Sequence, residues 1–142
     1  MSDRVIVVGV DGSQASLAPL RWALHEAALR QVDLRVVGVV DIRMQPMVPL
    51  GDKLGTDLMD AMVRQVEDVI DKVKDDASAV DIEQDVRAGN PSSQLIDLSK
   101  DAELLVVGRR GHSALAGLIM GSVATQVSAH ADCPVVVVHE SR

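Results

Sequence analysis

The chain has 142 residues, of which 47% are hydrophobic and 25% are charged, and its formal net charge is −7 at pH 7. A chain of this length predicts one domain, residues 1–142, that buries roughly 70% of its unfolded surface. The negative charge and a single aromatic residue, Trp22, argue against nucleic acid as a partner, because clustered basic residues and stacking rings are both missing.

The same composition favours the cytoplasm and argues against a membrane. The single cysteine, Cys133, cannot form an internal disulfide, which suits a reducing compartment. No apolar stretch reaches the ~18 residues of a membrane span, and the first residues lack a signal-peptide pattern. We therefore expect a soluble cytoplasmic protein.

Five valine-rich apolar runs predict strands, at residues 5–10, 34–40, 82–88, 104–107 and 135–138. The first, fourth and fifth are almost continuously apolar, as in strands covered on both faces. The third mixes apolar with polar residues, which indicates a sheet edge. Apolar residues recur at three- and four-residue intervals in two of the gaps, which predicts helices at about 17–28 and 54–77. Asn90 is expected to cap a third helix, with Pro91 in its first turn.

The alternation of strands and helices predicts an α/β fold: a single open doubly wound five-stranded parallel sheet with helices on both faces. Right-handed crossovers favour the strand order 3-2-1-4-5. Residues 41–53 form the only long loop, which can be a lid, a binding edge or a surface excursion.

The predicted sheet places two glycine-marked turns side by side. In an open parallel sheet, ligands bind outside the carboxyl ends of strands where the winding direction reverses, here between the first and fourth strands. The first strand ends in Gly9, Val10 and Asp11, and the fourth ends in Val107 and Gly108. Asp11 has two interpretations that stay open: it shapes an Asx turn or a helix cap, or its carboxylate meets ligand hydroxyls or a metal.

The segment that follows the fourth strand, residues 108–122, is called the glycine loop here. It contains Gly108, Gly111 and Gly121, and Ser122 closes it. These glycines can be ordinary turn residues, or positions where backbone N–H groups approach an anion. A continuous helix through Gly121 would cost ~1 kcal/mol per interior glycine, so we expect Ser122 to begin or cap the last helix, with its N–H groups toward phosphate.

Several other sites are disfavoured by the residue pattern. No glycine-lysine pair completes a P-loop, and no G-x-G-x-x-G follows a strand. The histidines lack metal-ligand spacing, and no serine has a nearby His–Asp arrangement. The third strand ends in Ala88, where a phosphate-accepting receiver domain would need an aspartate. No catalytic residue is assigned, and Cys133 is interpreted as buried packing.

These motifs together resemble the ATP-binding subgroup of the universal stress protein family over nearly the whole chain. The opening residues 7–13, VVGVDGS, are similar to the first strand and turn of that family. The glycine loop fits the subgroup pattern of glycine, two residues, glycine, nine residues, then glycine and serine. Residues 130–138, HADCPVVVV, resemble the closing strand of the family.

The resemblance implies an ATP site whose members share one edge of the sheet. Asp11 would lie near the ribose, and Val40 would meet the adenine edge through its backbone. A Mg or Mn ion with the nucleotide stays open, with Asp11 as an indirect candidate. The implied set is Gly9, Val10, Asp11 and Val40 at the nucleoside, Val107 and Gly108 at the ribose, and Gly111, Gly121, Ser122 and Val123 at the phosphates, helped by the backbone of Arg109, Arg110 and His112.

The resemblance also implies a homodimer through the last strand, which the sequence independently places as an apolar sheet edge. The function expected is an ATP-binding regulatory or sensor module in the stress response, acting through regulatory partners that the sequence does not identify. Two alternatives remain: a nucleotide-independent dimeric interaction module, or a weak ATPase. An ATP-consuming ligase or hydrolase of related fold lacks a visible substrate domain.

Overall fold

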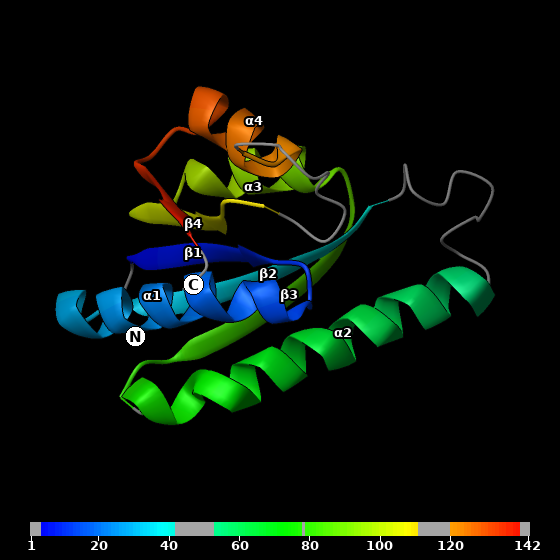
Figure 1. Cartoon of the computed structure of the whole chain (residues 1–142), viewed down its shortest axis with the longest axis horizontal. Coiled ribbons are helices and arrows are strands. Elements are labelled where there is room, and N and C mark those ends of the chain that lie inside the picture. The colour runs from blue at the N-terminus through cyan, green and yellow to red at the C-terminus, as the bar shows by residue number, and fades with distance from the viewer. Residues whose placement is uncertain (1–3, 42–52, 78, 111–119, 140–142) are drawn as a thin grey trace.

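A computed structural model describes residues 4–41, 53–77, 79–110 and 120–139 of the chain. It contains a parallel sheet of five strands in the order β3-β2-β1-β4-β5, as the sequence predicts (Figure 1). The elements in chain order are β1 (Val5–Val10), α1 (Leu17–Arg30), β2 (Asp33–Asp41), α2 (Lys53–Val73), β3 (Ile82–Gly89), α3 (Pro91–Ser99), β4 (Leu104–Gly108), α4 (Ser122–His130) and β5 (Val135–Val138). Short 3-10 helices at Gln14–Ser16 and Lys74–Ala77 precede α1 and follow α2.

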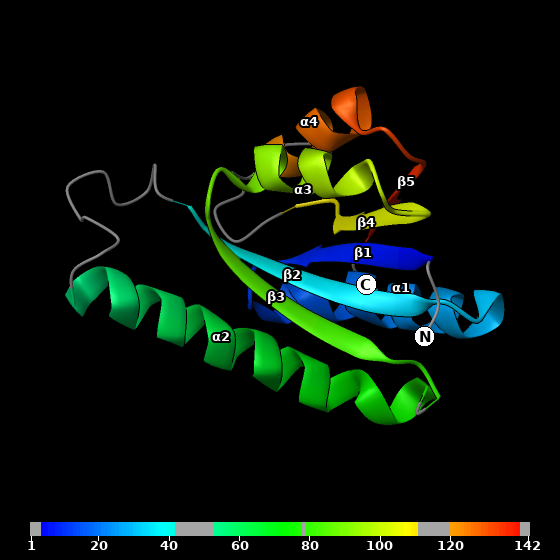
Figure 2. The ribbon, with the colours of Figure 1, turned by 180° about the vertical axis from the view of Figure 1, so that it is seen from behind.

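The helices cover the two faces of the sheet in pairs (Figure 2). Helices α1 and α2 lie on one face, and α3 and α4 lie on the other. Successive residues of β1 alternate between the two layers: Ile6 and Val8 pack with α1 and α2, whereas Val7 packs with α3 and α4. This double burial explains why the first and fourth runs are continuously apolar.

The last strand departs from the sequence prediction. All four valines of β5 are only half-buried, although a run of this kind is typical of a strand covered on both faces. The reason is its position, because β5 lies at the edge of the sheet and has a neighbouring strand, β4, on one side only. The third predicted strand, β3, forms the opposite edge, as expected.

The start of α3 and the end of α2 can both be compared with the prediction. The side chain of Asn90 accepts a hydrogen bond from the backbone N–H of Ser93 at 3.2 Å, so the predicted N-cap of α3 is confirmed. The long helix α2 ends at Val73 and tightens into the 3-10 turn that reaches Ala77, slightly earlier than its apolar period suggests.

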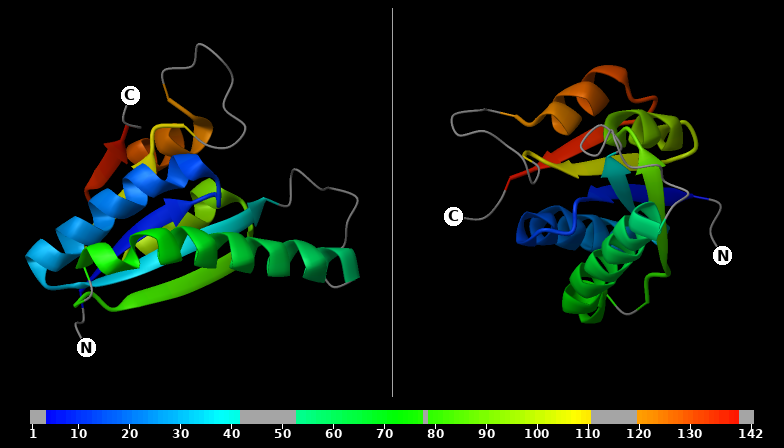
Figure 3. Two further views of the ribbon diagram at one scale, coloured as in Figure 1. Left: turned by 60° about the horizontal axis from the view of Figure 1, so that its bottom comes forward. Right: turned by 90° about the vertical axis from the view of Figure 1, so that its right-hand side faces the viewer.

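The winding direction reverses between β1 and β4. The helix that follows β1 lies on the α1–α2 face, whereas the helix that follows β4 lies on the α3–α4 face (Figure 3). The parallel register aligns Val10 of β1 with Gly38 of β2, and Gly108 of β4 with Val138 of β5, so all these carboxyl ends share one edge. This reversal is the place where open α/β sheets bind ligands.

Candidate functional site

The carboxylate of Asp11 shapes the turn that follows β1. Its Oδ1 accepts the backbone N–H of Ser13 at 2.9 Å, which is the geometry of an Asx turn, and the Ser13 hydroxyl at 2.6 Å. Of the two interpretations that the sequence left open, the structural one therefore holds for Oδ1. A ligand role for Asp11 stays a prediction.

Ser16 is a part of this turn that sequence reasoning missed. Its hydroxyl donates to Asp11 Oδ1 at 2.8 Å and accepts the backbone N–H of Asp11 at 3.1 Å, and the residue is only 4% exposed. A serine five residues after the aspartate, directly before the apolar period of the first helix begins at Leu17, is the signal that could have found it. Ser16 fixes both the backbone and the carboxylate of Asp11.

Gly12 continues the turn in a conformation that favours glycine, with φ of +82°. A Cβ built on Gly12 would lie 2.7 Å from Oε1 and 2.8 Å from Cβ of Gln65, a residue of α2. Helix α2 therefore packs directly against the turn at the end of β1. No pattern in the sequence indicates this contact.

The end of β4 is tied to both β5 and α4 through the backbone of Arg109. Its N–H donates to the carbonyl of Val138 at 3.0 Å, and its carbonyl accepts the N–H of Gly121 at 2.7 Å. The start of α4 is thus held against the end of β4, as the prediction of a site at Gly108 and Gly121 requires.

Helix α4 begins at Ser122, so the prediction of a break at Gly121 is confirmed. Gly121 is the N-cap in an extended conformation, with φ of −72° and ψ of 167°, and as a glycine it contributes no side-chain cap. Ser122 is exposed and Val123 is half-buried at this helix start. The first N–H groups of a helix and its partial positive charge suit an anion.

The two arginines of the glycine loop differ in their surroundings. The Nη1 of Arg109 lies 3.1 Å from Nδ1 of His139, so its side chain reaches past the end of β5. Arg110 is exposed. The predicted contacts at Gly111 and His112 lie outside the described residues.

The remaining predicted residues lie at the same edge of the sheet. Val40 is 9% exposed near the end of β2, and Val10 and Val107 are 8% and 2% exposed, so their side chains belong to the core. Gly9 has a packing reason of its own, because a Cβ there would lie 2.8 Å from Cδ1 of Leu95 in α3. These residues can offer backbone groups to a ligand.

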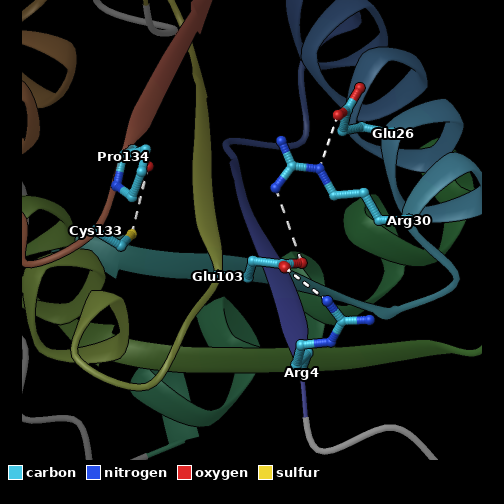
Figure 4. A network of polar contacts seen from close by, with 6 residues as sticks. All are labelled: Arg4, Glu26, Arg30, Glu103, Cys133 and Pro134. Atoms are coloured by element: carbon cyan, nitrogen blue, oxygen red, sulfur yellow. Dashed lines mark hydrogen bonds and ion pairs between the residues drawn. The ribbon is translucent and has the colours of Figure 1, made fainter.

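The opposite, amino edge of the sheet carries paired charges (Figure 4). Glu103 lies 3.1 Å from Arg4 and 3.9 Å from Arg30, which also contacts Glu26 at 2.8 Å. Cys133 lies at this edge and is half-buried. Burial, with a smaller contribution from the charge of Asp132, raises the pKa of its thiol.

Two further features concern the described part of the chain. No group of three or more His, Cys, Asp or Glu residues that could hold a metal ion occurs in it. Among the same residues, no helix combines the length and apolar composition that crossing a membrane requires.

A doubly wound parallel sheet, with a helix start and an aspartate turn at its switch point, defines a Rossmann-like α/β protein. The chain belongs to the universal stress protein family, whose family model matches residues 3–139. Universal stress protein Rv2624c of Mycobacterium tuberculosis is 36% identical over 134 residues, which cover 94% of this chain and 47% of the relative. The chain therefore spans about half the length of the curated relatives it matches.

Solved structures share this fold. The protein MJ0577 superposes with a TM-score of 0.84 at 18% identity and covers 100% of this chain and 99% of its own. A universal stress protein crystallised in complex with cAMP has a TM-score of 0.63 and 28% identity, and the match covers 97% of this chain and 98% of that one.

Proposed function

We propose that residues 1–142 form one nucleotide-binding domain that binds ATP and acts in the cytoplasm as a regulatory or sensor module of the stress response. The observation that carries the proposal is the start of α4 without a side-chain cap, held by the Gly121 N–H bond to Arg109 at the end of β4. A polyphosphate suits that position, because the first N–H groups of a helix have no partner within the helix and the helix dipole favours negative charge there.

The nucleoside would lie along the ends of β1, β2 and β4. An adenine nucleotide is supported by the 28% identical universal stress protein that was crystallised with cAMP. A chain with no tyrosine or phenylalanine would pack aliphatic residues against the base. The proposed contacts are Gly9, Val10, Asp11 and Val40 for the nucleoside, Val107 and Gly108 for the ribose, and Gly111, Gly121, Ser122 and Val123 for the phosphates, with backbone groups of Arg109, Arg110 and His112. A Mg or Mn ion accompanying ATP would be reached by Asp11 indirectly.

A nucleotide-independent interaction module is the second candidate, and two contacts favour it. Asp11 Oδ1 already has a complete role in its turn, and Gly9 is accounted for by Leu95. In this alternative the glycine loop only connects β4 to α4. Slow ATP hydrolysis would be a side activity of the first candidate.

We further propose a homodimer through β5. The carbonyl of Pro134 accepts the N–H of Leu105 in β4, and the carbonyl of Val138 accepts the N–H of Arg109 just after β4. Residues of a strand alternate in direction, so the backbone groups of Val135 and Val137 point away from β4. An apolar edge whose outward backbone groups have no partner strand among the described residues is suited to pairing with a second copy.

Mass spectrometry of gently purified protein tests the function directly. Co-purified ATP supports nucleotide binding, whereas an empty protein that also fails to bind added ATP supports the interaction module.

Calorimetry then compares ATP binding by the wild type and by Gly121→Val. Any residue can adopt the backbone conformation at position 121, and a valine side chain there should block the approach of phosphate. Ser128→Val, on an exposed position of the same helix, is the control. Equal ATP affinity in all three proteins would refute the phosphate position.

Steady-state release of ADP separates a binding protein from an ATPase. We expect turnover far below the typical enzyme range of about 1–1,000 per second. Turnover within that range would favour an enzyme instead.

A further inference from the structure

Side chains of helix α2 pack directly against the backbone of β2 at Gly38, which has no side chain to hold them away. A Cβ built on Gly38 would lie 2.8 Å from Cγ2 of Val66 and 3.2 Å from the sulfur of Met62. Those two α2 residues therefore occupy the space that a larger residue would fill. Since Gly38 pairs with Val10, this close approach is level with the carboxyl end of β1, three residues before β2 ends at Asp41.

Because Met62 and Val66 pack on β2 at Gly38, the neighbouring residue Gln65 of α2 lies against the turn that follows β1. Gln65 contacts Gly12 so closely that a Cβ there would be 2.7 Å from Oε1 and 3.3 Å from Cδ of its amide group. Gln65 lies between Met62 and Val66 in the sequence, so its backbone is fixed by their packing on β2. The side chain itself is exposed.

The Gln65 amide makes no hydrogen bond with any residue that the structure describes, whereas other polar groups around the turn do. The hydroxyls of Ser13 and Ser16 both donate to Asp11, and the amide of Gln84, also against α2, donates to the carbonyl of Val63 at 3.0 Å. A glutamine amide has two N–H donors and one carbonyl acceptor. At Gln65 these groups lie beside the turn and are available to a ligand.

We propose that Gln65 is a nucleotide-contacting residue, whose amide N–H donates to an oxygen of the ribose–phosphate part of ATP beside Gly12. The inference rests on the proposed function, because it needs a nucleotide at the end of β1. The sugar and phosphates of ATP carry many acceptor oxygens, which an amide donor on this side would engage. Helix α2 then forms a wall of the site, in addition to β1, β4 and α4.

The test separates hydrogen bonding from packing with two substitutions of nearly unchanged length. Gln65→Met keeps an unbranched side chain against Gly12 but removes the amide, and Gln65→Glu replaces the donor by a negative acceptor. Lys72→Gln is the control, because it also makes the net charge more negative by one and lies on α2, about 10 Å further along the helix. Calorimetry with ATP measures Kd for the four proteins, and thermal unfolding without nucleotide checks that their folds match.

We expect Gln65→Met to weaken ATP binding by about two- to tenfold, which corresponds to one hydrogen bond. Gln65→Glu should weaken it by about tenfold or more, since charge repulsion is added. Lys72→Gln should bind as the wild type does.

Two results would overturn the inference while leaving the proposed function intact. The first is a Kd for ATP in Gln65→Met that equals the wild-type Kd. The second is a loss of ATP affinity that is equal in Gln65→Glu and Lys72→Gln, which would show that only long-range charge weakens binding. A wild-type protein that binds no ATP would instead refute the proposed function.

Discussion

Asp11 and Ser16 hold each other through two hydrogen bonds that join one hydroxyl to both the backbone and the side chain of the aspartate. The Ser16 Oγ accepts the Asp11 N–H at 3.1 Å and donates to Oδ1 at 2.8 Å. The orientation of the Asp11 carboxylate is therefore set before any ligand arrives. A fixed carboxylate loses less conformational entropy on binding than a mobile one.

Replacing Ser16 should cost more stability than replacing Ser13. Ser16→Ala removes the hydroxyl that accepts the part-buried Asp11 N–H, so we expect a loss of about 1–3 kcal/mol in the free energy of unfolding. Ser13→Ala removes one hydroxyl donor from Asp11 Oδ1, which keeps two other donors, so the loss in the free energy of unfolding should be smaller. Urea unfolding followed by circular dichroism measures both. Equal losses would show that the two hydroxyls contribute alike.

Gly12→Ala should destabilise the protein by at least about 1–2 kcal/mol, the cost of a left-handed conformation for a residue with a Cβ. The contact with Gln65 adds to that cost. Gly108→Ala is the matched control, because its Cβ would meet nothing closer than the carbonyl oxygen of Arg110 at 3.4 Å. Denaturant midpoints of the two variants give the comparison. A Gly12→Ala protein as stable as Gly108→Ala would contradict the turn geometry.

Val137→Pro should abolish dimerisation and leave the fold in place. The N–H of Val137 points away from β4, so proline removes a donor from the open edge without breaking the bonds between β4 and β5. Sedimentation velocity should show a dimer for the wild type and a monomer for the variant. Val137→Thr keeps the N–H and the branched shape, and should remain dimeric. A dimeric Val137→Pro protein would place the interface elsewhere.

Cys133 should react slowly with iodoacetamide near neutral pH. Burial raises the pKa of its thiol, so the reactive thiolate forms only at a higher pH than in an ordinary cysteine. Mass spectrometry measures the alkylation rate at a series of pH values. The rate should rise at a higher pH than the rate for free cysteine in the same buffer, and unfolding in urea should remove the difference. A rate profile identical to that of the free amino acid would contradict this environment.

Much of the fold could be predicted because it depends on local periodicity. The continuous apolar run of β1 indicated burial on both faces, and Asn90 with Pro91 indicated the start of α3. The edge at β3 followed from its polar residues. The edge position of β5 followed from the predicted strand order, but the half-exposure of its side chains did not follow from its composition, because four valines look alike in the middle of a sheet and at its edge.

The candidate site, too, could be predicted from the sequence only in part. The sequence alone determined that Asp11, Gly108 and Gly121 belong to turns at one edge, since strand order and direction decide where carboxyl ends meet. Only the tertiary structure decided that Leu95 fills the space at Gly9 and that Gln65 lies against Gly12. Such contacts join segments more than 50 residues apart, and they depend on how closely each helix packs on the sheet, which no local pattern encodes.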